Sequence, residues 1–140
     1  QVNPTSPLVR TDEIKSFVTK MLEGDFDTML SVKREQVEGF YKGKPINFNQ
    51  MEQMPRSQDL ESIYLHCSTI LAWKSKVIRE KMEKFNCCTY GADSKVGYYT
   101  FDSFANIDID NEDDFVFADT IIQYLKKPKD RVKKYYSIDK

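Results

Sequence analysis

Apolar residues recur at helical spacing in three segments of the chain. We expect the first helix to start at Thr11 as its N-cap and to end at Gly24, since threonine favours the start and glycine the end of a helix. Its apolar face is Ile14, Phe17, Val18, Met21 and Leu22. The pattern predicts two more helices, over residues 75–85 and 115–125. Their expected inward residues are Val77, Ile78, Met82 and Phe85, and Phe115, Ala118, Ile121, Ile122 and Leu125.

Three other segments are rich in the apolar, β-branched and aromatic residues that favour strands. They are centred on Met29–Val32, on Ile63–Trp73 and on residues 96–102. Residues 38–48, "EGFYKGKPINF", contain glycine and proline between aromatic residues and predict a hairpin or extended arm. The polar residues 49–60 are expected to form a loop. Strands that alternate with helices indicate an α/β fold with helices packed on a sheet.

Composition and charge exclude several classes of function. The chain has 140 residues, of which 40% are hydrophobic and 31% charged, and its net charge is −1. These values are typical of one globular domain. A net charge near zero produces no long-range electrostatic attraction to nucleic acid or to an anionic membrane. The apolar runs are too short to span a bilayer. Residues 126–140 form a basic tail that contains tyrosines, and we interpret it as a solvated end rather than a nucleic-acid site.

The cysteines do not indicate a disulfide framework. The chain has three cysteines, Cys67, Cys87 and Cys88, and the last two are adjacent. An odd count with an adjacent pair favours reduced thiols and a cytoplasmic setting. His66 is the single histidine and lies beside Cys67, so a zinc site lacks ligands at workable spacings. Cys87 and Cys88 are expected to be buried or half-buried spacers after a helix.

The stretch "NIDIDNEDDF", residues 106–115, contains the candidate chemistry. Asn111 is a suitable N-cap, and the acids at 112–114 would complement the helix dipole without any further function. Asp108 and Asp110 are not explained in this way. Side chains two residues apart in an extended segment point to the same face, and two carboxylates there favour a cation between them. Their spacing and oxygen ligands suit magnesium, but spacing alone leaves a purely structural role open as the alternative.

Four segments in order resemble the C-terminal part of the acylneuraminate (CMP-sialic acid) cytidylyltransferases. They are "QVNPTSPLVR" at residues 1–10, "RSQDL" at 56–60, "IYLHCSTILAW" at 63–73 and "IDIDNEDDFVFAD" at 107–119. The resemblance covers residues 1–125 and leaves the tail, 126–140, outside. It implies a three-layer, nucleotide-sugar-transferase-like mixed sheet and a homodimer.

The resemblance also implies a reaction and its residues. In such enzymes the anomeric hydroxyl of a nine-carbon sugar acid, such as N-acetylneuraminate, attacks the α-phosphate of CTP, and pyrophosphate leaves. Asp108 and Asp110 match the aspartates that bind Mg²⁺ in this catalysis. Gln1 matches a glutamine near the sugar, and Arg56 matches an arginine that pairs with its carboxylate. Lys33 follows a predicted strand, and two interpretations stay open for it: a substrate-binding residue or a solvated lysine.

Two departures from the family pattern limit these expectations. Cys67, Ser68 and Leu71 stand where the family commonly has Asn-Gly and then tyrosine, so the acceptor is open between N-acetylneuraminate and a relative such as legionaminate. The family's N-terminal nucleotide-binding half, with its phosphate-binding loop, is absent, and the chain opens without methionine. We therefore expect the 140 residues alone to be inactive. The alternative function is a non-catalytic dimerisation or binding module derived from this fold.

Overall fold

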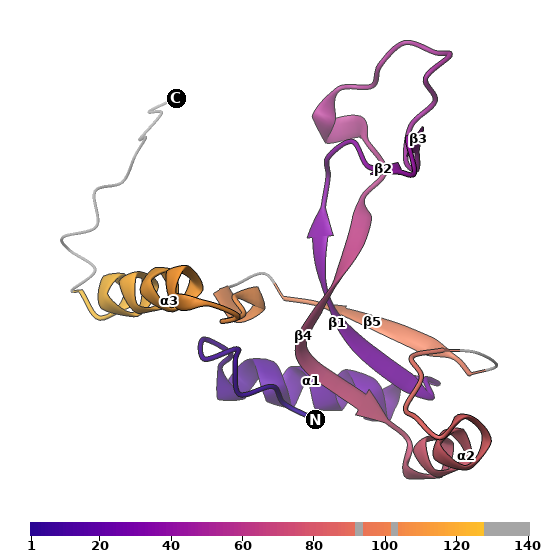
Figure 1. The fold of residues 1–140 in the computed structure, drawn as a ribbon, viewed down its shortest axis with the longest axis vertical. Coiled ribbons are helices and arrows are strands. Elements are labelled where there is room, and N and C mark those ends of the chain that lie inside the picture. Colours follow the sequence, from indigo (N-terminus) through magenta and orange to yellow (C-terminus); the bar gives the residue numbers. More distant parts are fainter. Residues whose placement is uncertain (92–93, 102–103, 128–140) are drawn as a thin grey trace. The chain divides into compact units, whose positions relative to one another are not determined.

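The structure, a computed structural model, describes residues 1–91, 94–101 and 104–127. The chain divides into two compact units, Gln1–Asp108 and Ile109–Lys140, of which the first contains every described strand (Figure 1). Most of the predicted basic tail, from residue 128 onward, lies outside the described residues. Within the described part of the chain, no helix is both long enough and apolar enough to cross a membrane.

The first unit is built on a three-stranded mixed sheet. Its central strand, β1 (Thr28–Glu35), pairs antiparallel with β4 (Ile63–Trp73) and parallel with β5 (Val96–Thr100). A parallel neighbour requires a crossover connection, and here the chain passes through β4 and helix α2 (Ser75–Phe85) before it returns as β5. The predicted α/β class with a mixed sheet is confirmed. The predicted bounds of β4 and α2 agree with the structure.

Helix α1 (Thr11–Glu23) supplies the apolar core over one face of this sheet. Phe17 is fully buried, and its ring meets the Tyr99 ring edge to face at 5.4 Å. The buried core cluster consists of Phe17, Met29, Ile70, Phe101 and Ala105. Burying a phenylalanine side chain stabilises a fold by about 1.5–3 kcal/mol, so Phe17 anchors α1 to the sheet.

The start of α1 differs by one residue from the prediction. Thr11 is the first helical residue rather than the N-cap, and Arg10 precedes it in an extended conformation. The backbone N–H of Arg10 donates to the Glu13 carboxylate at 2.8 Å. This backward reach of a glutamate satisfies a donor that a helix start otherwise leaves unpaired, so the helix does not need the Thr11 hydroxyl as a cap.

Beyond Val32, where β5 ends, β1 and β4 continue as a two-stranded ribbon of residues 33–35 and 63–65. The chain between them forms a small hairpin, β2 (Phe40–Tyr41) and β3 (Lys44–Pro45), as predicted. We call residues 33–65 the arm; Figure 1 shows the hairpin lying past the end of the ribbon. The 3₁₀ turn Ser57–Asp59, labelled η1 below, belongs to the loop that was predicted as polar.

The hairpin turn and its base are held by local chemistry. Lys42 and Gly43 have φ of 50° and 76°, so both central residues of the two-residue loop are left-handed, as a type I′ turn requires. The Asn47 side chain accepts from the Gly39 N–H at 2.9 Å and donates to the Glu61 carbonyl at 2.7 Å. This amide therefore ties the hairpin to the segment that enters β4.

The prediction for the buried face of helix α2 is right for Val77 and Ile78, which are half-buried, and wrong for Met82 and Phe85. Met82 and Phe85 are 46% and 41% exposed, whereas Lys81 is only 4% exposed. The Lys81 ammonium donates to the Gly91 carbonyl, which satisfies the charged end while its alkyl stem is buried. Helical spacing placed the apolar residues on one side but could not show that the loop after the helix packs against a lysine.

Helix α3 (Glu112–Leu125) lies in the second unit. Ala118 is buried as predicted, but Phe115 and Leu125 are both 55% exposed, which corrects their expected inward placement. Phe115–Phe117 are three consecutive apolar residues. In a helix, successive side chains point in directions about 100° apart, so one packed face cannot bury all three.

Candidate functional site

An irregularity in the β1–β4 pair organises the candidate site. Leu30 pairs with Leu71, but Val32 pairs with His66, so the single residue Ser31 lies opposite residues 67–70 of β4. This is a large irregular bulge in β4, with four residues opposite one. Bulges bend a strand and redirect side chains, and they are frequent beside active sites.

The Ser31 hydroxyl closes the bulge. It accepts a hydrogen bond from the Ile70 N–H at 3.0 Å and donates to the Cys67 carbonyl. Ser31 and Ile70 are both buried, so the Ile70 N–H has no water as a ready substitute for this acceptor. Sequence reasoning missed Ser31; the available signal was a small hydroxyl residue inside an otherwise apolar strand.

The N-terminal segment pairs with the free edge of β4 at this bulge. The backbone nitrogen of Gln1 donates to the Leu71 carbonyl at 2.8 Å, and the Leu71 N–H donates to the Gln1 carbonyl at 3.0 Å. The Asn3 N–H donates to the Thr69 carbonyl at 3.0 Å. Gln1 itself is exposed, so its backbone is fixed while its side chain stays accessible.

The segment that leads to Asp108 is attached to the same bulge. The Thr69 hydroxyl donates to the Ala105 carbonyl at 2.9 Å, and the Cys67 thiol donates to the Asn106 side-chain oxygen at 3.0 Å. Burial raises the pKa of the Cys67 thiol, which keeps this donor protonated at neutral pH. Residues 1–3, 67–70 and 104–106 thus meet at the bulge, and we call them together the bulge site, which Asp108 follows by two residues.

Asp108 is the last residue of the first unit, and one oxygen of its carboxylate is buried. Its Oδ1 atom is buried and has no hydrogen-bond partner among the described residues. Buried polar atoms are nearly always paired, and a bound ion or water is one of the physical reasons for an unpaired one. Ser6, Thr28 and Thr89 each have a hydroxyl oxygen in the same situation. Asp108 is the only predicted site residue with this property in the described part of the chain.

Asp110 belongs to the second unit, at the entrance to α3. Its side chain is exposed, and its backbone N–H donates to the Asp114 carboxylate at 3.1 Å. Asp114 also accepts from the Asn111 N–H, while Asn111 Oδ1 accepts from the Asp114 N–H, each at 3.1 Å. The predicted cap at Asn111 is therefore confirmed, and the cap employs Asp114 rather than the Asp110 side chain.

Lys33 and Arg56 lie on the arm. The Lys33 ammonium is 2.6 Å from the Glu35 carboxylate on the same strand, and the Lys33 side chain is 56% exposed. The Arg56 guanidinium is 2.7 Å from Asp59, and its side chain is 74% exposed. Both predicted binding residues are therefore held locally by exposed ion pairs, which contribute about 0–1 kcal/mol each to stability.

The arm also separates Arg56 from the bulge site in the same chain. Ile63, where β4 begins, is six residues from Thr69, a length of roughly 20 Å in an extended strand. Gln36 at the end of β1 donates to the Leu60 carbonyl at 2.9 Å, which places the loop containing η1 at the far end of the ribbon. The structure therefore attaches the Gln1 backbone and the segment just before Asp108 to one bulge, and it leaves Arg56 away from that bulge.

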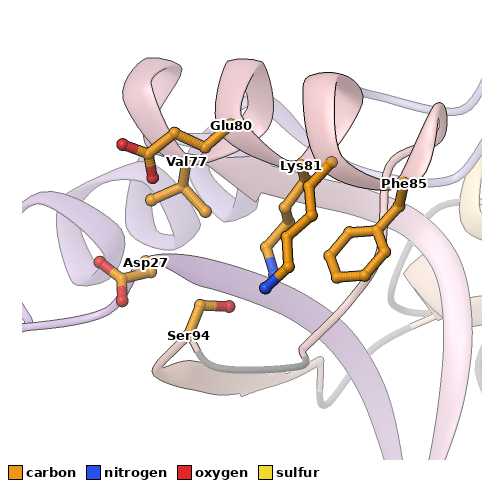
Figure 2. A pocket seen from close by; sticks show the side chains of 7 residues that line it. Asp27, Val77, Glu80, Lys81, Phe85 and Ser94 are labelled. Carbon is orange, nitrogen blue, oxygen red and sulfur yellow. The ribbon is translucent and has the colours of Figure 1, made fainter.

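A pocket of about 180 Å³ lies elsewhere, between α2 and the strand ends (Figure 2). The lining residues are Asp27, Val77, Glu80, Lys81, Lys84, Phe85 and Ser94. Figure 2 shows the Lys81 side chain extending from α2 into it. No predicted site residue lines this pocket. Its lining mixes acids and lysines that already have partners, so we do not assign the predicted chemistry to it.

The comparisons with known proteins do not decide the function. The chain matches no known protein-family model and shows no significant similarity to a curated protein. Among the described residues, no group of three or more histidine, cysteine, aspartate or glutamate side chains could hold a metal ion.

Proposed function

We propose that this chain is the C-terminal part of a CMP-sugar-acid synthetase. In complete form, the enzyme transfers CMP from CTP to a nonulosonic sugar acid such as N-acetylneuraminate and releases pyrophosphate. The observation that carries the proposal is the buried, unpartnered oxygen of Asp108, in the segment where the family resemblance expects a magnesium ligand. The α/β class with a mixed sheet supports the expected three-layer, nucleotide-sugar-transferase-like architecture.

Magnesium fits the donors that this segment offers. Mg²⁺ is usually held by one or two carboxylates, with water and substrate phosphates completing its shell, so Asp108 and Asp110 suffice as the protein ligands. An ion at Asp108 would satisfy the oxygen that has no partner among the described residues. When bound, Mg²⁺ would neutralise charge on the phosphates during in-line transfer.

The proposed sugar site includes the bulge. Gln1, fixed by its backbone to Leu71, would present its side-chain amide to the sugar. Cys67, Ser68 and Leu71 occupy positions that help to shape the sugar pocket in the family. The bulge places Cys67 against Asn106 rather than in solvent, so the acceptor would be selected by a surface different from that of the Asn-Gly pattern.

We further propose a homodimer in which the arm of one copy packs on the other. A two-stranded ribbon is marginally stable in water by itself. The hairpin beyond it exposes three apolar side chains: Phe40 is 59%, Tyr41 64% and Ile46 56% exposed. A second copy would cover these residues, and it would let Arg56 serve its partner's sugar site rather than its own. Lys33 lies on the same arm.

The test uses the protein in which this chain is joined to a nucleotide-binding half. We expect pyrophosphate and a CMP-sugar to form only when CTP, Mg²⁺ and one acid from a panel of nonulosonic acids are all present. The 140-residue chain alone should form neither, because it has no glycine-rich phosphate loop after a strand. CMP-sugar synthesis by the isolated chain would contradict this division of roles.

The second candidate function is a binding module that keeps the fold without the chemistry, and the exposed hairpin favours it. The assay for pyrophosphate and CMP-sugar described above distinguishes the synthetase from the binding module. A folded, dimeric full-length protein that releases no pyrophosphate with any acid would support the binding module. Turnover would exclude it.

A further inference from the structure

The end of α2 brings two sulfur atoms into contact, and a third sulfur-bearing residue, Cys87, is next to one of them in the chain. Asn86 terminates the helix with φ of 54°, in the left-handed region, and its N–H donates to the Met82 carbonyl at 2.9 Å. This turn reverses the chain, so that Cys88 returns to the last turn of the helix. The Cys88 Sγ atom lies 3.9 Å from the Met82 Sδ atom, and Cys87 is its immediate neighbour in the chain.

All three side chains are accessible. Cys87, Cys88 and Met82 are exposed, and both thiols are free. The expectation that the two cysteines are buried or half-buried spacers was therefore wrong. The physical reason is that the helix ends at the left-handed Asn86, so the helical periodicity behind the expected burial does not extend to residues 87 and 88. Cys67 differs, because it is half-buried and its thiol is hydrogen-bonded to Asn106.

We propose that Cys87, Cys88 and Met82 form a binding site for a soft monovalent d¹⁰ metal ion, with Cu(I) as the reference case. Thiolate and thioether sulfurs are the ligands that select Cu(I) over harder ions. Two sulfur ligands about 2.3 Å from one metal, at trigonal or tetrahedral angles, are about 3.8–4.0 Å apart. The 3.9 Å separation of Cys88 Sγ and Met82 Sδ agrees with that spacing.

The donor set argues against zinc at these cysteines. No third histidine, cysteine, aspartate or glutamate joins them among the described residues, and a structural zinc site needs four such ligands. Methionine is a poor ligand for zinc but a good one for Cu(I). Binding converts two thiols into thiolates and releases two protons, so the affinity should rise with pH.

The first experiment is an anaerobic competition for Cu(I) between the reduced 140-residue chain and the Cu(I)–bicinchoninate complex, followed by the loss of the complex's colour. We expect the chain to withdraw one Cu(I) per molecule. The Cys87→Ser, Cys88→Ser double variant should withdraw none at the same ligand concentration. Cys67→Ser is the matched control and should behave as the unchanged chain. A chain that does not compete, or a double variant that competes equally well, would overturn the site.

A second pair of variants tests the thioether. Met82→Leu keeps the size and apolar character of the side chain but removes the sulfur, and we expect it to weaken Cu(I) binding about tenfold. Met54→Leu, which changes a methionine of similar exposure on the arm, should leave the affinity unchanged. X-ray absorption of the Cu(I)-loaded chain should detect three sulfur ligands. Equal affinities of Met82→Leu and Met54→Leu, or half a Cu(I) per chain, would contradict a three-sulfur site within one molecule.

Discussion

The Ser31 hydroxyl is the single group whose removal should most disturb the candidate site. In Ser31→Ala, the Ile70 N–H loses its acceptor and the Cys67 carbonyl loses its donor. A buried backbone group left without a partner costs about 1–3 kcal/mol. Because Cys67 is only half-buried and water can reach part of that region, we expect a total loss of about 2–4 kcal/mol rather than the full sum.

This loss is measurable against the stability of a typical domain, which is about 5–15 kcal/mol. Urea unfolding followed through Trp73 fluorescence should give a midpoint lower by about 1–2 M, with an unchanged slope. Ser62→Ala is the control, because its hydroxyl accepts one exposed hydrogen bond from Arg34 at 2.9 Å, and it should change stability by less than about 0.5 kcal/mol. Amide exchange at Ile70 should accelerate only in Ser31→Ala. If both variants unfold at the same urea concentration, the hydroxyl does not close the bulge as described.

Three further predictions concern a cap, a charge pair and a binding residue. Asn111→Ala removes the side-chain cap of α3 and should destabilise the helix by about 1 kcal/mol, seen as faster amide exchange in its first turn. Lys95 holds the pKa of Asp25 below 3.8, so Lys95→Ala should raise that pKa in an NMR titration. The stabilisation from this pair is present above about pH 4 and is lost as the pH falls through the lowered pKa, so the two proteins should converge in acid. Arg56→Ala should change stability by less than about 1 kcal/mol but raise KM for the sugar acid about tenfold in the complete enzyme.

Segments with a strong, local pattern could be predicted well from the sequence. The run from Ile63 to Trp73 and the helix over residues 75–85 have the predicted bounds, because long apolar runs and helical spacing are decided by neighbouring residues. The Lys42–Gly43 hairpin and the Asn111 cap also depend only on local backbone preferences.

Features that depend on distant residues could not be predicted. The bulge at residues 67–70 exists because Ser31, which is 39 residues from Ile70, bridges it. Burial of Lys81 depends on the Gly91 carbonyl after the helix. The sequence pattern singled out Asp108 as a candidate site residue. The burial of one of its carboxylate oxygens, without a partner among the described residues, is seen only in the folded chain.

The most direct test of the proposed function compares three acids of one stretch in the complete protein. Asp108→Asn and Asp110→Asn remove proposed magnesium ligands, whereas Asp113→Asn changes an exposed acid in the first turn of α3. CMP-sugar formation should be followed over a range of Mg²⁺ concentrations for each variant. We expect the first two to lower kcat/KM by about a hundredfold or more and the third to stay within about twofold of the unchanged protein. If Asp108→Asn and Asp110→Asn keep both the rate and its Mg²⁺ dependence, these aspartates do not hold the metal, and the proposed catalytic site is wrong.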